Sequence, residues 1–98
     1  MAVAVSVTAT RRAQLQIALT ADYLTARSPV AAKRFAERLE RAYQQISQFP
    51  ESGPRRSRNT RRLVMSPYIL TYRIGPTGVE VLDVRHGRQR EHTIPDHG

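Results

Sequence analysis

Residues 28–53 constrain the fold most strongly, because this segment marks both ends of one long helix. The hydroxyl of Ser28 suits the free amides of a first turn, Pro29 suits the first helical position, and Pro50 cannot continue a helix. The spacing therefore predicts a helix over residues 29–48. At about 100° per residue, one face of this helix collects the apolar side chains of Ala32, Phe35, Ala36, Leu39, Ala42, Tyr43, Ile46 and Phe49. We expect this face to pack against the core.

A second helix is predicted over residues 11–27, which contain no glycine or proline and follow Thr10, a residue type favoured at helix starts. Only Ser28 separates the two helices, so they should form an antiparallel hairpin. The apolar side chains of residues 11–27 fall into two sets on opposite sides: Ala13, Ile17, Ala21 and Leu24 in one, Leu15, Leu19, Tyr23 and Ala26 in the other. We therefore expect this helix to be covered twice, once by the sheet and once by the other helix.

The remaining regular segments carry strand patterns. Val3, Val5 and Val7 alternate with small or polar residues, as in a half-buried strand. Three further runs follow, at residues 62–65, 68–74 and 79–86. A tight loop at 75–78 joins the last two, and apolar residues on both faces at 81–84 place the last strand inside the sheet. The order β-α-α-β-β-β predicts an α+β domain with the helical hairpin packed on a small antiparallel sheet.

The chain has 98 residues, which gives room for one core and no second domain. We expect residues 1–90 to form this single domain and the polar residues 91–98 to form a flexible tail. The absence of cysteine excludes disulfides and thiolate nucleophiles. No metal-spaced cluster and no phosphate-loop glycine pattern occurs, so we expect no cofactor and no metal. With no apolar run long enough for a membrane span, we expect a cytoplasmic protein.

A basic segment follows the longer helix and contains no acidic residue. Its arginines are Arg55, Arg56, Arg58, Arg61 and Arg62. The net charge of the chain is +8, and arginine presents a planar fork suited to phosphate and carboxylate groups. An acidic protein segment and nucleic acid are therefore the leading ligands. The alternative is a solvated loop without function, but neighbouring like charges repel one another and favour a binding role.

A second candidate site lies at the end of the last strand. His86 is followed there by Gly87, and its basic neighbours are Arg85, Arg88 and Arg90. Nearby positive charge favours the neutral imidazole, which can accept a proton during cleavage of a phosphodiester. The alternative is a histidine whose hydrogen bond ends the strand. Tyr68 and Tyr72 are expected to lie in the core rather than to stack on a ligand.

Several short motifs carry a family resemblance when they are taken in order. They are Thr10-Arg11-Arg12-Ala13, Tyr23-Leu24, Ser28-Pro29-Val30-Ala31-Ala32, and the segments 46–53, 68–74 and 79–88. With these motifs the chain resembles the ParE/RelE superfamily of toxins from type II toxin-antitoxin modules, and more closely its ParE branch. The resemblance implies the same fold, a ParD-like ribbon-helix-helix antitoxin with an acidic C-terminal segment, and toxicity when the antitoxin is lost. One departure is Gln16, where the family often has aspartate.

The resemblance leaves two activities open. RelE-like members cleave mRNA in the ribosome and typically carry an Arg-Leu-Val-Tyr run in the third strand, where this chain has Ile69-Leu70-Thr71-Tyr72. An isoleucine cannot stabilise a phosphorane, and the single Lys33 lies on a helix, so this reading is weakened. If it held, the catalytic residues would be Arg73, His86 and Arg88. ParE-like members act on DNA gyrase without a catalytic constellation, and we predict this activity, which would make the protein a non-enzymatic toxin.

The preferred reading assigns a role to each basic cluster. The antitoxin is expected to bind Arg55, Arg56, Arg58, Arg61 and Arg62. The target, DNA gyrase, is expected to bind Arg85, His86, Arg88 and Arg90. A basic nucleic-acid-binding module is a third reading, but Glu37 and Glu40 interrupt the basic exposed face of residues 29–48 and argue against a recognition helix.

Overall fold

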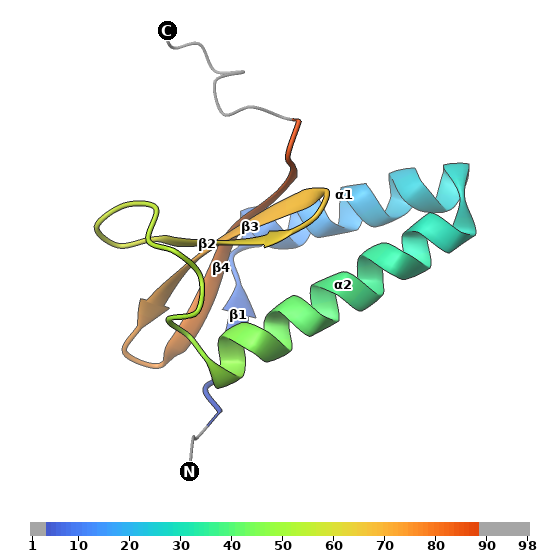
Figure 1. Ribbon diagram of the computed structural model, residues 1–98. Helices are drawn as coiled ribbons and strands as arrows, with labels where there is room; N and C mark the ends of the chain where they lie inside the picture. The colour runs from blue at the N-terminus through green and yellow to red at the C-terminus, as the bar shows by residue number, and fades with distance from the viewer. Residues whose placement is uncertain (1–3, 89–98) are drawn as a thin grey trace, which may run out of the picture.

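The computed structural model of the chain describes residues 4–88. The elements follow the predicted order β-α-α-β-β-β (Figure 1). They are β1 (Val7–Ala9), α1 (Arg11–Arg27), α2 (Pro29–Gln48), β2 (Arg61–Met65), β3 (Tyr68–Gly75) and β4 (Gly78–His86). The two helices pack on one face of the sheet, and the element order predicted from the sequence is confirmed.

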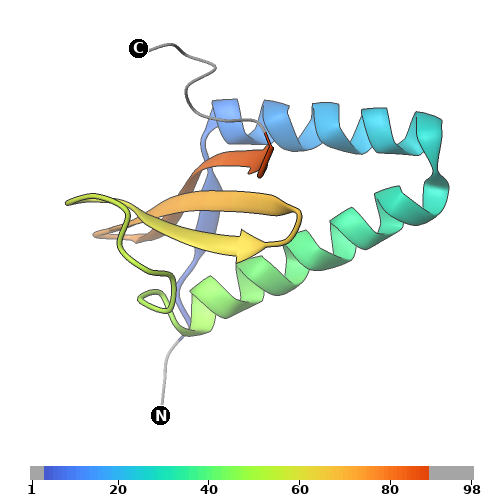
Figure 2. The same ribbon diagram turned by 45° about the horizontal axis from the view of Figure 1, so that its top comes forward.

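Side-chain caps fix the two helices where the sequence predicts them. Thr10 Oγ1 accepts a hydrogen bond from the Ala13 amide at 3.1 Å, and Ser28 Oγ accepts one from the Ala31 amide at 3.2 Å. The Ser28 amide also donates to the Leu24 carbonyl at 2.7 Å, so one residue ends α1 and begins α2. From this turn the helices diverge, and the sheet lies toward their open ends (Figure 2).

The sheet has the strand order β1-β4-β3-β2. Its last strand, β4, therefore lies between two neighbours, as its apolar faces predict. The pairs β2/β3 and β3/β4 are antiparallel, but β1 pairs with β4 in parallel. The predicted α+β fold is confirmed, but the sheet is mixed rather than antiparallel because of the direction of β1. No tight turn joins β1 to its partner, so turn geometry cannot impose an antiparallel direction on this pair.

The first strand also begins later than the valine alternation predicts. The Val5 amide donates to the Ser47 carbonyl at 3.0 Å, and Ser47 Oγ donates to the Val5 carbonyl at 2.6 Å. Val5 is therefore attached to the end of α2 rather than to the sheet, and β1 starts at Val7. Val3, the first valine of the pattern, lies outside the described residues.

The core lies between the helices and the sheet face that carries Tyr68, Leu70 and Tyr72. Phe35 of α2 meets the Tyr68 ring edge-on, with 4.9 Å between ring centroids, and Ile46 is fully buried. Both tyrosines thus belong to the core, as predicted. The other buried apolar side chains are Ala13, Ala42, Met65, Val79, Val81 and Val84.

Several parts of the predicted apolar faces are not fully buried, including Ala36, which is exposed on α2. Leu39 is only partly buried against the core, and 58% of Phe49 is exposed where α2 ends. In α1 the set containing Ala13 faces the core, whereas Leu15, Leu19 and Tyr23 are more than half exposed. The expectation that α1 is covered on two opposite sides is therefore wrong, because α2 and the sheet both contact the same side of α1.

Candidate functional site

The basic segment is a loop with a rigid base. Tyr72 Oη donates to the Pro50 carbonyl at 2.7 Å and accepts from the Gly53 amide at 3.0 Å. Arg61 Nη1 donates to the carbonyls of Glu51 and Gly53 at 3.2 and 3.0 Å. A methyl group on Gly53 would lie 2.7 Å from the Arg62 carbonyl oxygen, so this turn requires glycine. The loop therefore leaves α2 in a fixed direction.

The arginines of the loop divide between two clefts. A cleft of about 640 Å³ lies between the loop and the β3–β4 turn, and its arginines are Arg55, Arg58, Arg61 and Arg73. A second cleft of about 480 Å³ brings Arg56 of the loop together with Arg12 of α1 and Arg85 of β4. Arg62 lies in β2 and lines neither of them. The five arginines predicted to form one binding surface thus contribute to two.

Arg73 lies on the sheet face that points away from the helices, because it alternates with Tyr72 along β3. Its guanidinium contacts the Glu80 carboxylate through Nε at 2.9 Å and Nη2 at 2.6 Å. Both side chains are partly exposed. This ion pair links β3 to β4 beside the larger cleft.

His86 lies at the end of β4, on the helix side of the sheet. Its ring meets Tyr68 edge-on, with 5.4 Å between centroids, and its Nδ1 accepts the Arg88 amide at 3.0 Å. This contact matches the alternative in which a histidine hydrogen bond ends the strand. In the sheet register His86 pairs with Tyr68 and Arg73 with Glu80, so the two residues occupy opposite ends and opposite faces of the hairpin. Arg90 lies outside the described residues.

The fold does not bring the proposed nuclease residues together. Arg73 is separated from His86 by the sheet, and Arg88 contacts His86 through its backbone amide. Of the predicted target-binding residues, Arg85 lines the smaller cleft, while His86 and Arg88 follow it at the strand end. Within residues 4–88, no three histidine or carboxylate side chains are placed to hold a metal ion. No helix in this part of the chain is long and apolar enough to cross a membrane.

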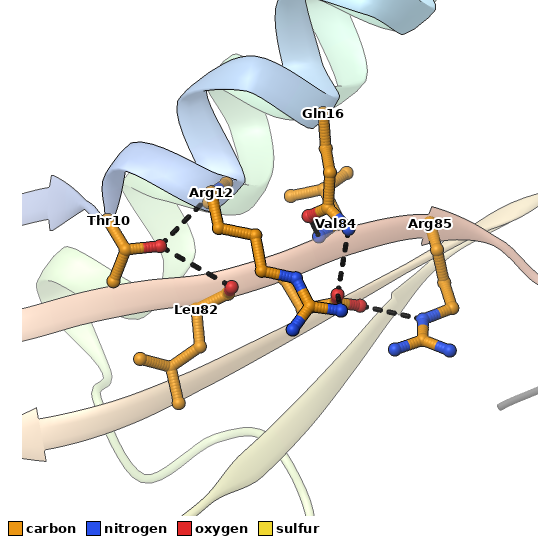
Figure 3. Close-up of polar contacts among 8 residues, drawn as sticks. Thr10, Arg12, Gln16, Leu82, Val84 and Arg85 are labelled. Carbon is orange, nitrogen blue, oxygen red and sulfur yellow. Dashed lines mark hydrogen bonds and ion pairs between the residues drawn. The ribbon is translucent and has the colours of Figure 1, made fainter. Parts of the chain in front are cut away.

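A buried carboxylate in the smaller cleft connects α1 to β4. Asp83 is 7% exposed and contacts Arg85 Nε at 2.7 Å and Arg12 Nη2 at 3.3 Å. Gln16 donates through Nε2 to Asp83 at 2.9 Å and accepts the Val84 amide through Oε1 at 2.9 Å. Figure 3 shows Arg12 and Gln16 reaching from α1 toward β4, with Arg85 approaching from the strand.

The electrostatics of this cluster keep Asp83 ionised. Burial alone raises the pKa of Asp83, but hydrogen bonds from Arg85 and Gln16, with the charges of Arg85 and Arg12, outweigh it and lower the pKa below its ordinary value. The cluster also explains Gln16, because an aspartate there would repel Asp83 and could not donate to it. Sequence reasoning missed this contact. The available signal was the spacing of Arg12 and Gln16, which places both on one helix face.

The chain is similar to known proteins both in fold and in sequence. The chromosomal ParDE system from P. aeruginosa has the same fold, with a TM-score of 0.69 and 18% identity over 84% of this chain and 95% of that one. The toxin RelE2 of Caulobacter vibrioides is 33% identical over 78 residues, covering 79% of this chain and 89% of that protein. RelE3 of the same organism is 32% identical over 83 residues, covering 81% and 90%.

The matching family model defines the class of protein as the toxin of a type II toxin-antitoxin module. Residues 7–91 match the family model described as the ParE toxin of the type II toxin-antitoxin system parDE, and the chain belongs to this family.

Proposed function

We propose that this toxin inhibits DNA gyrase by binding it, and that a ParD-like antitoxin neutralises the toxin. Membership of the ParE family supports the proposal, as does the separation of the basic side chains. The proposed antitoxin contact is the loop with Arg55, Arg56 and Arg58, together with Arg61 and Arg62 at the start of β2. The proposed gyrase contact is the end of β4 with Arg85, His86, Arg88 and Arg90.

The observation that carries the gyrase proposal is the placement of His86. General acid–base cleavage needs a proton-transfer group within reach of groups that stabilise the developing charge on phosphorus. Among the described residues, His86 packs against Tyr68 and its Nδ1 is occupied by the Arg88 amide. Arg73 lies beyond the sheet and is paired with Glu80. A toxin that acts by binding requires no such assembly.

A RelE-like mRNA endonuclease is the second candidate, and the relatives named RelE2 and RelE3 favour it. In that case Arg73, His86 and Arg88 would carry the cleavage. An antitoxin would neutralise the toxin in either case, so neutralisation does not distinguish gyrase inhibition from mRNA cleavage. The identity of the target distinguishes them.

The deciding experiment is controlled induction of the toxin in cells, with translation, mRNA ends and gyrase-linked DNA breaks followed in the same culture. We expect DNA breaks and a DNA-damage response while translation continues. The His86→Gln variant should retain antitoxin binding and show no change in mRNA ends. Arrest of translation with mRNA cut in the ribosome and unchanged DNA, reversed on the order of 10²–10⁴-fold by His86→Gln, would instead establish the nuclease.

A further inference from the structure

The tip of the basic loop is a tight turn that carries two hydroxyl side chains. The amides of Arg56 and Ser57 both donate to the Thr60 carbonyl, at 2.8 and 3.2 Å. The hydroxyl groups of Ser57 and Thr60 are hydrogen-bonded to each other at 2.7 Å. Ser57 is exposed, whereas Thr60 is partly buried. The turn therefore holds the Ser57 hydroxyl at the surface in a defined place.

This turn lines the smaller cleft, which has a volume of about 480 Å³. Ser57 and Thr60 share the cleft with three arginines from three parts of the chain. These are Arg56 of the loop, Arg12 of α1 and Arg85 of β4. A water molecule takes about 30 Å³ in the liquid, so the cleft has room for a phosphate group. An exposed hydroxyl group and three guanidinium groups thus meet in one cleft.

The cleft carries an excess of positive charge. Among the described residues that line it, Asp83 is the one acid, and its carboxylate is engaged by Arg85 at 2.7 Å and Arg12 at 3.3 Å. Asp83 positions these two arginines but balances one of the three positive charges (Figure 3). An anion that bound in the cleft would therefore meet guanidinium groups whose places the fold already sets.

The sequence around Ser57 fits the substrates of arginine-directed protein kinases. Arg55 and Arg56 precede Ser57, Arg58 follows it, and the basic segment contains no acidic residue. Kinases select their substrates in part by the pattern of charges beside the acceptor, and an acidic substrate groove is complementary to these arginines. The exposed turn makes the Ser57 hydroxyl accessible to such an enzyme.

We propose that Ser57 is a phosphorylation site and that Arg12, Arg56 and Arg85 bind the resulting phosphate in the smaller cleft. In the transfer, Ser57 Oγ forms a bond to the γ-phosphorus of ATP, and the bond from that phosphorus to the bridging oxygen breaks to release ADP. The hydroxyl proton passes to a base of the kinase. Phosphoserine carries a charge of about −1.5 to −2 at neutral pH and three strong acceptor oxygens. These oxygens are matched by the guanidinium groups of the cleft.

Phosphorylation at Ser57 would weaken the antitoxin contact and so release the toxin. Arg56 belongs to the proposed contact, and the phosphate would engage its guanidinium in charge-assisted hydrogen bonds. The phosphate would also oppose the approach of an acidic segment to the loop. This effect on the antitoxin rests on the proposed function, whereas the acceptor and its arginine cleft do not depend on an antitoxin.

The first test is phosphorylation of the full chain by a kinase that requires arginine two residues before serine, with ATP labelled on the γ-phosphate. We expect a single phosphate, located at Ser57 by mass spectrometry. Ser57→Ala should lose the label, whereas Ser66→Ala, at an exposed serine in the β2–β3 turn, should keep it. No labelling of wild type, or labelling of another residue, would overturn the assignment of the acceptor.

The second test compares chains made with phosphoserine in place of Ser57 or in place of Ser66. Nearby arginines favour the doubly charged phosphate, so the titration midpoint seen by phosphorus NMR should lie about one pH unit lower at position 57. Arg12→Gln, Arg56→Gln should abolish this difference, whereas Lys33→Gln, Arg34→Gln on the exposed side of α2 should preserve it. Matching circular dichroism spectra would show that the variants are folded. Equal midpoints at the two positions would overturn the cleft as a phosphate site.

The third test measures binding of a ParD-like antitoxin to the same two phosphorylated chains by calorimetric titration. Their net charges are equal, so a difference in affinity reports the position of the phosphate. We expect phosphate on Ser57 to weaken binding on the order of tenfold relative to phosphate on Ser66. Equal affinities would contradict the regulatory role. A toxin that binds no ParD-like protein when unmodified would refute the proposed function, and the first two tests would still decide the phosphorylation site.

Discussion

At the scale of single residues, Asp83 is the one charged residue that is buried in the described part of the molecule. Its carboxylate joins Arg12 and Gln16 of α1 to Arg85 of β4, and Gln16 also satisfies the Val84 amide. The Val84 amide points away from β3, toward the side on which β1 pairs with β4. Because β1 ends at Ala9, opposite Val81, the strand does not reach as far as Val84. The side chain of Gln16 thus occupies the place that a longer β1 would fill. Asp83 in turn orients Gln16.

The lowered pKa of Asp83 predicts how stability depends on pH. A carboxyl group whose folded pKa is below its unfolded value of about 3.9 stabilises the protein above that value. The contribution is lost as the pH falls through the folded pKa. Asp83→Asn should therefore lower the free energy of unfolding near pH 7 by about 1–3 kcal/mol, and this difference should shrink as the pH falls through the folded pKa. Urea unfolding of both proteins between pH 2 and pH 7 measures this difference.

Asp22→Asn, on the exposed side of α1, is the control for this measurement. A loss of stability in Asp83→Asn that does not depend on pH would contradict the prediction.

At the scale of elements, α2 connects the core to the basic loop. Its inner face buries Phe35, Ala42 and Ile46, and its end is held by the contacts of Tyr72 with Pro50 and Gly53. Tyr72 is fully buried on β3, so the loop is attached directly to the core. Loss of packing on α2 is therefore expected to affect the loop as well as the helix.

Ile46→Ala should lower the free energy of unfolding by about 2–5 kcal/mol, because Ile46 is fully buried and its loss leaves a cavity. In a domain of this size each kcal/mol corresponds to about 4–8 °C in melting temperature. Thermal unfolding followed by circular dichroism measures the shift. Leu39→Ala is the comparison and should cost less, since Leu39 is only partly buried beside a groove that already lies between α2 and Val7. A larger loss for Leu39 than for Ile46 would contradict this assignment of the core.

Local sequence signals predicted most of the elements. Caps at Thr10 and Ser28 and the stop at Pro50 fixed the helix limits, and the apolar pattern of β4 placed it inside the sheet. The direction of β1 was not predictable, because the alternation of valines is the same in parallel and antiparallel pairs. Which set of apolar residues on α1 is buried depends on where α2 and β4 pack, and the helix sequence alone does not contain this.

The candidate site was less predictable than the fold. The sequence shows where the runs of basic residues are. It does not show where each side chain lies, because this depends on the register of the strands and on the face of the sheet that the residue occupies. Arg73 and His86 are the clearest case, since the hairpin places them at opposite ends of the sheet. Arg55 and Arg56 are neighbours in sequence yet line different clefts. Asp83, the partner of Arg12, lies far along the chain, so the spacing of Arg12 and Gln16 on one helix face does not identify it.

At the scale of the whole molecule, the net charge of +8 attracts any acidic partner over a distance comparable to the Debye length. Long-range attraction and local contact can be separated because they depend on different features. Attraction follows the net charge, whereas contact depends on which arginines meet the partner. The larger cleft offers Arg55 and Arg58 for such contact, while Arg61 is engaged in holding the loop.

Arg55→Glu, Arg58→Glu should weaken antitoxin binding at low salt and flatten its dependence on salt concentration. Calorimetric titration over a series of salt concentrations provides the measurement. Lys33→Glu, Arg34→Glu changes the net charge by the same amount on the exposed side of α2 and is the control. If both double variants lose affinity equally, net charge rather than the loop determines binding. Unchanged affinity in the loop variant would remove the loop from the antitoxin interface.

The parallel pairing of β1 with β4 has a consequence for the synthesis of the toxin. Val7 pairs with Val79, and β4 lies between β1 and β3 in the sheet. The four-stranded sheet therefore cannot form until nearly all of the described chain has left the ribosome. Contacts between residues so far apart in sequence also slow folding. A nascent toxin therefore passes through a period in which α1 and α2 are exposed and its functional surfaces are not yet assembled. An antitoxin already present at that stage would meet the helices before the sheet is complete.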